Sequence, residues 1–223
     1  KVEALNWAGS IEYPIVYKLR CGASSQNVKL IRTYKQARKI ISVAFGRGHL
    51  VYDAKESLRE RFRKYRLGKT NAKDVLKGLI RIVYPPDYAW MKSREKGYVY
   101  FQKFVPYNDH DIRVIVIGNK AFAIKRMVRE GDFRASGSGN ILYDKSLFNE
   151  ETIELSFRLA EKLKSQCVAF DYIFENGKPM VTEIGYGFSQ EVYKLCPGYW
   201  DKGLNWYEGK FNPYGWMVEN LIS

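Results

Sequence analysis

The chain has 223 residues, of which 46% are hydrophobic and 15% aromatic, and this composition excludes an intrinsically disordered protein. Its formal net charge of +13 at pH 7 predicts an anionic partner, such as nucleic acid, anionic lipid, a polyanionic glycan or a nucleoside triphosphate. No apolar run approaches the roughly 18 residues that a membrane-spanning helix needs, so we expect no membrane span.

The three cysteines, Cys21, Cys167 and Cys196, are widely spaced and odd in number. Their spacing matches neither a disulfide framework nor a zinc site, which favours a reducing, cytoplasmic setting. Because the chain begins with Lys rather than Met, we expect a fragment of a longer protein.

The first half of the chain is predicted to begin with two strands and a helix. "YPIVYKL" and "VKLIRTY" are rich in β-forming residues, and "CGASSQN" between them is typical of a turn. "YKQARKIISVAF" has helical spacing, and residues 53–83 are predicted mainly helical because apolar residues recur every three or four positions. The densest basic run, residues 59–69, is interpreted as a solvated helix face.

The second half is predicted to combine hairpins with one clear helix. Residues 98–128 are rich in strand formers, with a turn near Gly118-Asn119. Residues 149–166 are predicted helical because acids occupy the first turn and lysines the last. "AFDYIFENGKPMVTEIGYG", residues 169–187, indicates two apolar strands joined by a tight turn. This mixture of antiparallel hairpins and helices predicts an α+β fold.

The first candidate binding segment is Lys18 with the small-residue loop that follows it, residues 22–27. Small residues allow backbone N–H groups to approach phosphate oxygens, and a strand-borne lysine can neutralise their charge. The segment is not a Walker A motif, because no Gly-Lys-Ser/Thr follows the loop. The alternative interpretation is a simple hairpin turn.

The second candidate is the hairpin around Gly118-Asn119. A three-residue loop would place Arg113 opposite Lys125, and two facing cations are unfavourable without an anion. Arg134 follows in "GDFRASGSGN", a small-residue loop that could fold over a ligand. The alternative interpretation is three solvated surface cations.

The third candidate is the pair of carboxylates in the last hairpin, Asp171 and Glu183. A two-residue turn at 176–177 would send the two acids to opposite faces, whereas a three-residue loop at 175–177 would make them neighbours on one face. Neighbouring carboxylates repel unless a proton or a cation lies between them. Oxygen ligands on rigid strands suit Mg²⁺, which often shares substrate phosphates.

From about Tyr13 to Gly187 the order of these motifs resembles the ATP-grasp superfamily, with the RimK-like and glutathione-synthetase-like carboxylate–amine ligases as the nearest types. "YPIVYKLRCGASSQNV" resembles the lysine strand and glycine loop, and "YFQKFVPYNDHDIRVIVIGNKAFAIKR" the hinge and the Asp-Ile-Arg hairpin. "GDFRASGSGN" is similar to the Phe-Arg-Ser-Asn loop, and "AFDYIF…VTEIG" to the Asp…Glu-x-Asn metal strands. The tail "CPGYWD…LNW…WMVENL" also resembles ATP-grasp proteins found among polysaccharide-biosynthesis genes.

The resemblance implies two lobes, residues 1–104 and 105–223, that hold ATP between them. The small lobe would contain the phosphate loop and a helical insertion, and the large lobe the metal-binding strands and the aromatic tail. The implied catalytic residues are Arg113 and Arg134, and the implied Mg²⁺ ligands are Asp171 and Glu183. The implied ATP-binding residues are Lys18, Gly22, Ser24, Ser25, Gln102, Lys103, Phe104, Val105, Asp111 and Lys125. The resemblance implies that residues 102–105 form the hinge whose backbone contacts adenine and that Asp111 contacts the ribose.

The implied reaction is activation of a carboxylate by ATP and Mg²⁺ as an acyl phosphate, which an amine then attacks. The basic surplus suggests an acidic sugar or polysaccharide precursor as the carboxylate. The chain departs from the family pattern at Gly185, where an Asn ligand is expected, and it begins after the usual preceding domain.

Two alternative functions are a phosphotransferase acting on a hydroxyl and a non-catalytic nucleotide- or polyanion-binding module. Nucleic acid is disfavoured as a partner because the aromatic residues do not interleave with the basic runs. Trp200, Trp206 and Trp216 would either line an acceptor pocket or cover the end of the core.

Overall fold

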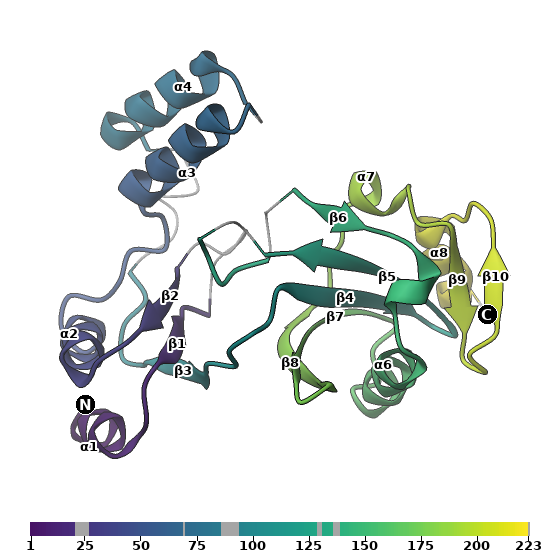
Figure 1. Ribbon diagram of the computed structural model, residues 1–223, viewed down its shortest axis with the longest axis horizontal. Helices are drawn as coiled ribbons and strands as arrows, with labels where there is room; N and C mark the ends of the chain where they lie inside the picture. Colours follow the sequence, from purple (N-terminus) through teal and green to yellow (C-terminus); the bar gives the residue numbers. More distant parts are fainter. Residues whose placement is uncertain (21–26, 69, 86–93, 129–130, 136–138, 223) are drawn as a thin grey trace. The chain divides into compact units, whose positions relative to one another are not determined.

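The computed structural model describes residues 1–20, 27–68, 70–85, 94–128, 131–135 and 139–222. The chain divides into two compact units, Lys1–Phe104 and Val105–Ser223. Both units combine helices with antiparallel strands, which confirms the predicted α+β class (Figure 1). No described helix is long and apolar enough to cross a membrane.

The first unit contains a small sheet with the strand order β2-β1-β3, in which both outer strands are antiparallel to β1. Ile15 and Tyr17 of β1 are buried against two helices, α1 and α2. Because side chains alternate along a strand, Lys18 projects from the opposite face of the sheet. The elements are α1 (Val2–Ser10), β1 (Ile15–Lys18), β2 (Val28–Ile31), α2 (Tyr34–Ala44) and β3 (Tyr100–Lys103).

The helical insertion of the first unit is a hairpin of α3 (Ala54–Arg66) and α4 (Ala72–Val83), as predicted for residues 53–83. The side chain of Asn71 accepts a hydrogen bond from the backbone N–H of Asp74 and so caps α4. Gly78 allows close packing of the two helices, because a Cβ atom there would lie 2.8 Å from Cδ of Arg61.

The second unit is built on a larger antiparallel sheet with the strand order β10-β9-β5-β4-β7-β8, and β6 pairs with the edge of β5 (Figure 1). Its strands are β4 (His110–Ile117), β5 (Lys120–Met127), β6 (Ile141–Leu142), β7 (Cys167–Glu175), β8 (Lys178–Gly185), β9 (Gly198–Asp201) and β10 (Trp206–Glu208). Its helices are the 3₁₀ helix η1 (Lys145–Leu147), α6 (Glu150–Lys162), α7 (Gln190–Tyr193) and α8 (Pro213–Ile222).

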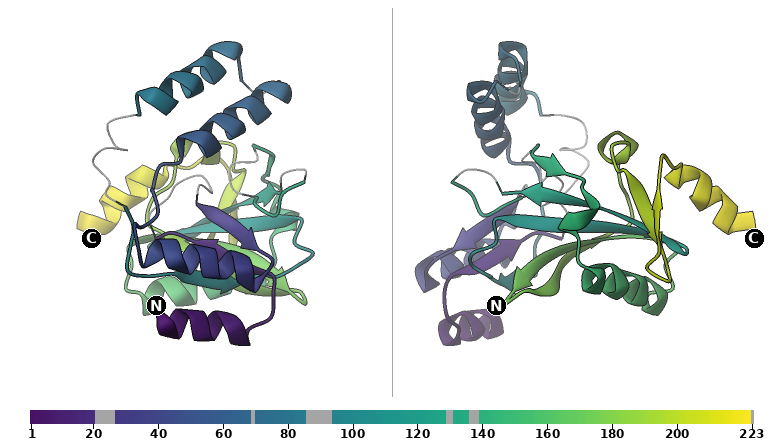
Figure 2. Two further views of the ribbon diagram at one scale, coloured as in Figure 1. Left: turned by 90° about the vertical axis from the view of Figure 1, so that its left-hand side faces the viewer. Right: turned by 45° about the vertical axis from the view of Figure 1, so that its right-hand side comes forward.

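Both faces of this sheet are covered, which explains why the second half of β4, residues 114–117, is continuously apolar. Helix α6 packs on one face, where Val114 and Phe170 are buried (Figure 1 and Figure 2). The other face holds a second core around Phe122, whose ring meets the aromatic tail. Trp200 and Trp216 are buried in these two cores and Trp206 packs against the first, so the tail tryptophans cover the core.

One buried phenol predicts a loss of stability at alkaline pH. Burial raises the pKa of Tyr172 to about 12, although its hydrogen bond of 2.9 Å with Ser156 acts in the opposite direction. The unfolded chain therefore loses this proton near pH 10, before the folded chain does. The free energy of unfolding should fall by about 2–3 kcal/mol between about pH 10 and 12 from this group alone. Urea titrations at several pH values should show a shallower decline in Tyr172→Phe.

Candidate active site

In the first unit, Lys18 lies at the end of β1, where it pairs with Val28 and Tyr100. Gly22, Ser24 and Ser25 lie outside the described residues, so the phosphate loop stays a prediction.

The predicted adenine hinge, residues 102–105, coincides with the boundary between the two units, which falls between Phe104 and Val105. Gln102 and Lys103 end β3, and the side-chain amide of Gln102 donates a hydrogen bond of 2.8 Å to the hydroxyl of Tyr100. Adenine recognition by this segment stays a prediction.

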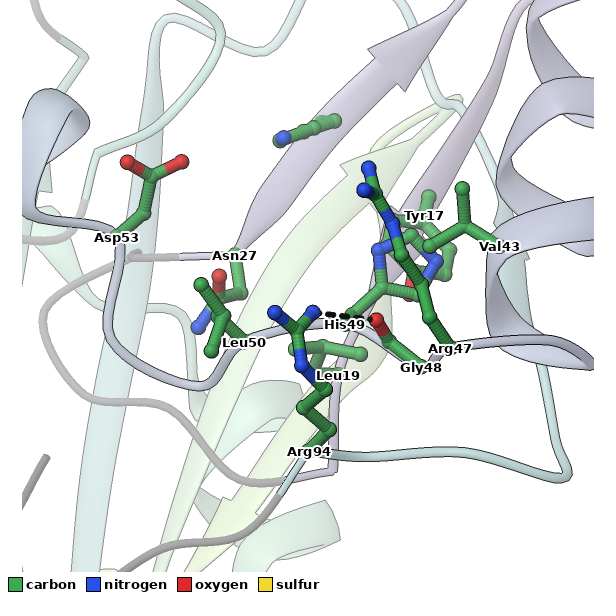
Figure 3. A pocket seen from close by; sticks show the side chains of 11 residues that line it. Tyr17, Leu19, Asn27, Val43, Arg47, Gly48, His49, Leu50, Asp53 and Arg94 are labelled. Carbon is green, nitrogen blue, oxygen red and sulfur yellow. Dashed lines mark hydrogen bonds between the residues drawn. The ribbon is translucent and has the colours of Figure 1, made fainter. Parts of the chain in front are cut away.

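The first unit contains a cavity of about 160 Å³, and Figure 3 shows side chains that line it. Its wall includes Tyr17, His49 and the cations Arg47 and Arg94. Burial lowers the pKa of His49, and the nearby cations lower it further. Tyr17 and Lys18 project from opposite faces of β1, so Lys18 does not line this cavity, whereas Asn27, the last residue of the predicted phosphate loop, does.

In the second unit, the hairpin of β4 and β5 has a different register from the one predicted. Its turn contains two residues, so Ile117 pairs with Lys120, and Arg113 pairs with Ile124 rather than with Lys125. A shift of one residue exchanges the two faces of a strand. Lys125 therefore lies on the α6 face, away from Arg113, and the expected pair of facing cations is wrong.

The corrected register brings Arg126 to the functional face instead. Arg126 pairs with Asp111 across the two strands, and it was not among the predicted site residues. The signal that could have identified it is the Gly118-Asn119 turn, because a two-residue loop places Asp111 opposite Arg126.

The last hairpin brings Asp171 and Glu183 together through a strand pairing that differs from both predicted registers. Its turn is the two-residue Asn176-Gly177 loop, with both residues at positive φ, so Glu175 pairs with Lys178. That register alone would separate the acids. A β-bulge adds Thr182 to β8, and Asp171 then pairs directly with Glu183. The Thr182 hydroxyl donates a hydrogen bond of 3.1 Å to the backbone carbonyl of Asp171.

These registers assemble a network of two buried aspartates and two arginines on one face of the sheet. Arg126 donates hydrogen bonds of 2.6 and 2.7 Å to the two carboxylate oxygens of Asp111. Its Nη2 atom lies 2.8 Å from Oδ2 of Asp171, and Nη1 of Arg113 lies 3.2 Å from the same oxygen. Both oxygens of Asp111 are thus engaged by Arg126, and its role as a ribose contact stays a prediction.

The network is held in its charged form by mutual neutralisation. Burial lowers the pKa of Arg126, but Asp171 and Asp111 outweigh this effect and keep the pKa above its ordinary value. Burial raises the pKa of Asp111, although the guanidinium of Arg126 opposes the rise. The negative charges of Asp111 and Asp171 are therefore neutralised mainly by the buried guanidinium of Arg126.

One oxygen of the network has no partner. Oδ1 of Asp171 is buried and accepts no hydrogen bond from any described residue. Glu183, its cross-strand neighbour, is exposed, and the described residues provide it with no hydrogen-bond or ion-pair partner. A buried acceptor without a donor is costly, so this position favours a cation or a water molecule beside the two acids.

The pair of carboxylates fits Mg²⁺ better than a metal that needs several protein ligands. The described residues contain no group of three or more His, Cys, Asp or Glu side chains that could hold a metal ion. Mg²⁺ is commonly bound through one or two carboxylates, with water and substrate phosphates as the other ligands. Asp171 and Glu183 are therefore suited to hold Mg²⁺ together with a nucleotide.

Gly185 leaves room for a guanidinium rather than supplying a third ligand. A Cβ atom at Gly185 would lie 3.4 Å from Nη2 of Arg113. The same Nη2 atom donates a hydrogen bond of 3.2 Å to the backbone carbonyl of Gly187. Gly185, at the position where the predicted pattern has Asn, thus lies next to the guanidinium of Arg113.

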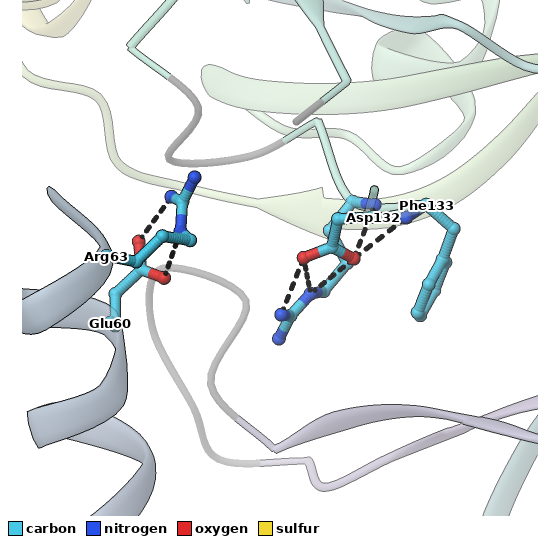
Figure 4. A network of polar contacts seen from close by, with 5 residues as sticks. Glu60, Arg63, Asp132 and Phe133 are labelled. Atoms are coloured by element: carbon cyan, nitrogen blue, oxygen red, sulfur yellow. Dashed lines mark hydrogen bonds and ion pairs between the residues drawn. The ribbon is translucent and has the colours of Figure 1, made fainter. Parts of the chain in front are cut away.

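Arg134 forms a local ion pair with Asp132, a residue that Figure 4 labels. Its Nη2 atom lies 2.7 Å from Oδ2 of Asp132, and its Nε atom donates to both oxygens of that carboxylate. Burial raises the pKa of Asp132, but the hydrogen bonds from Arg134 outweigh it and bring the pKa below its usual range. Contact between Arg134 and a transferred phosphoryl group stays a prediction.

Comparison with known proteins gives a family match for the central part of the chain. The model of the RimK-like ATP-grasp domain matches residues 90–192. No curated protein matches the chain.

Three solved structures are similar at low sequence identity. A RimK-domain ATP-grasp protein from Sphaerobacter thermophilus DSM 20745 has a TM-score of 0.47 and 14% identity, covering 99% of this chain and 56% of that one. The biotin carboxylase domain of 2-oxoglutarate carboxylase from Hydrogenobacter thermophilus has a TM-score of 0.47 and 13% identity, covering 86% and 35%. D-alanine–D-alanine ligase from Bacillus anthracis has a TM-score of 0.40 and 15% identity, covering 86% and 49%. The chain thus spans 35–56% of the length of these proteins.

The segment matched by the family model contains β4, β5 and β7, from which the network of arginines and aspartates projects, and β8, which bears Glu183. Residues 90–192 of the chain are thus similar to the RimK-like domain of the ATP-grasp superfamily.

Proposed function

We propose that the protein is an ATP- and Mg²⁺-dependent carboxylate–amine ligase. The observation that supports this most directly is the unpartnered Oδ1 atom of Asp171, which is buried beside the exposed carboxylate of Glu183. Arg113 lies on the same face of the sheet as these two acids. The carboxylates that would bind a cation are therefore next to a guanidinium that would bind a phosphate. A Mg²⁺–nucleotide complex presents both complementary charges.

The chain's residues would bind and orient the nucleotide rather than react with it. Asp171 and Glu183 would hold Mg²⁺, which when bound supplies neutralisation of phosphate charge. Arg113 and Arg134 would contact the oxygens of the transferred phosphoryl group. Lys18 and the loop after it would approach the remaining phosphates, and residues 102–105 would contact the adenine.

The proposed reaction has two steps. A substrate carboxylate attacks the γ-phosphorus of ATP, which forms an acyl phosphate and releases ADP. An amine then attacks the acyl carbon, which forms an amide and releases inorganic phosphate. Both steps depend on positioning and charge neutralisation, so no protein nucleophile is required.

The carboxylate substrate is proposed to be an acidic sugar or a polysaccharide precursor. The formal charge of +13 supports an anionic substrate, because a basic surface raises the local concentration of anions. A dependence of product formation on an amine would distinguish this ligase from a phosphotransferase that acts on a hydroxyl.

The first test is calorimetric titration of ATP, with and without Mg²⁺, into the wild type, Glu183→Ala and Glu175→Ala. We expect Mg²⁺ to strengthen ATP binding in the wild type, and we expect Glu183→Ala to lose that enhancement because one of the two carboxylates is gone. Glu175→Ala is the matched control, since it removes an acid from the turn end of the same hairpin. ATP binding that is equally Mg²⁺-dependent in all three proteins would contradict the assigned metal site.

A further inference from the structure

We propose that the hairpin of α3 and α4 is a docking surface for anionic lipid headgroups and lies on a membrane surface through the apolar face of α4. This inference is independent of the ligase activity and concerns a part of the chain that the candidate active site does not use.

The apolar face of α4 is exposed. The side chains of Leu76, Leu79, Ile80 and Val83 follow the helical spacing of three and four residues that places them on one face. Each of these residues is between 49% and 70% exposed, and Ile82 beside them is 42% exposed.

The partner helix does not cover this face. Helix α3 packs against the side of α4 that contains Gly78, where a Cβ atom would lie 3.0 Å from Cδ1 of Leu58. Phe62 of α3 is itself 52% exposed, so the partner helix adds apolar surface. Within the first unit, the described residues give α3 and α4 no other extensive packing partner. Exposed apolar side chains gathered on one helix face are typical of an interaction site.

The charge of the hairpin favours an anionic occupant. Residues 54–83 contain ten basic and three acidic residues, a net charge of +7, which is more than half of the chain's formal +13. Two of the acids are neutralised inside the hairpin, because Asp74 pairs with Arg61 and Glu60 pairs with Arg63, the second of which Figure 4 shows.

The basic residues border the apolar face. Lys73, Lys77 and Arg81 recur every four residues along one side of α4, next to the side of the apolar face formed by Ile80. None of the three has an acidic partner among the described residues. Basic side chains beside an apolar helix face match the boundary between lipid headgroups and acyl chains, where lysine stems extend toward the headgroups.

The same charge disfavours a second copy of this chain as the occupant. Two hairpins of charge +7 would repel each other on close approach. A bilayer surface requires no matching groove, and a helix face of this convex form can bury its apolar side chains there directly.

The test is co-sedimentation of the full chain with phosphatidylcholine vesicles, with and without about 30% phosphatidylglycerol, at about 0.1 M salt. We expect binding to the anionic vesicles that is at least about tenfold tighter than to the neutral ones. Leu79→Ser with Ile80→Ser should weaken binding by about tenfold or more, because two apolar side chains no longer enter the bilayer. Both residues are exposed, so circular dichroism should show an unchanged fold.

The electrostatic contribution is tested by a second pair of variants. Lys73→Gln with Lys77→Gln should weaken binding by about fivefold per lysine, or roughly 25-fold together. The matched control is Lys35→Gln with Lys39→Gln, two exposed lysines with the same spacing on α2, and it should change binding by less than about twofold.

Three results would overturn the proposal. The wild type could remain in the supernatant with anionic vesicles, or the α2 control could weaken binding as strongly as the α4 pair. The third is concentration-dependent self-association in sedimentation velocity that Leu79→Ser abolishes, which would assign the apolar face to a second copy of the chain.

Discussion

Replacing Arg126 by alanine is expected to lower the free energy of unfolding by about 3–5 kcal/mol, because it leaves two buried carboxylates without their shared cation. The Arg126 side chain is 9% exposed and contacts both Asp111 and Asp171 at 2.8 Å or less. The loss should be measured by urea unfolding near neutral pH.

The matched comparison for this variant is Arg113→Ala. The Arg113 side chain is twice as exposed, and it meets Asp171 at 3.2 Å while Arg126 remains in place. Its removal should therefore cost only about 1 kcal/mol. If the two variants lost the same free energy of unfolding, Arg126 would not be the main group that neutralises the buried aspartates.

Arg113→Ala is expected to reduce catalysis instead, by about 10²–10³ in kcat, if Arg113 stabilises charge on the transferred phosphoryl group. The measurement is ADP release from the Mg²⁺–ATP complex, either uncoupled or with the carboxylate found in a substrate screen. Arg113→Lys should recover part of the rate, since the charge is kept and the planar guanidinium is lost.

Arg158→Ala is the control for this second prediction. Arg158 is an exposed cation on α6, on the other face of the sheet from Arg113, and its removal should leave the rate within about twofold. A normal rate in Arg113→Ala would contradict the proposed catalytic role, and a large loss in Arg158→Ala would indicate a general effect of charge.

Of the two arginines that contact Asp171, Arg126 is thus expected to contribute mainly to stability and Arg113 mainly to catalysis. Arg126 is enclosed by acids and has little surface for a ligand, whereas Arg113 reaches the region of Gly185 and Gly187. Both contact the same oxygen of Asp171, and the other oxygen of that carboxylate has no hydrogen-bond partner among the described residues.

Local chemistry in the sequence was sufficient to predict the elements of this protein and their order. The helix predicted at 149–166 is α6, and its cap is a short-range interaction in which the side chain of Asn149 accepts from the backbone N–H of Thr152. The helical spacing of 53–83 likewise appears as α3 and α4. Short stretches contain the information for such elements, because caps and periodicity act over a few residues. The order of the motifs was enough for the ATP-grasp resemblance, which the family match confirms for residues 90–192.

Strand register was decided only by the tertiary structure. A two-residue turn at Gly118 exchanged Lys125 for Arg126 on the functional face, and a bulge at Thr182 placed Glu183 opposite Asp171. Because side chains alternate with a period of two, a difference of one residue reverses which of them share a face. The sequence by itself determined which charged residues the strands contain; the turn length and the bulge, selected by packing on both faces of the sheet, decided which of those charges meet.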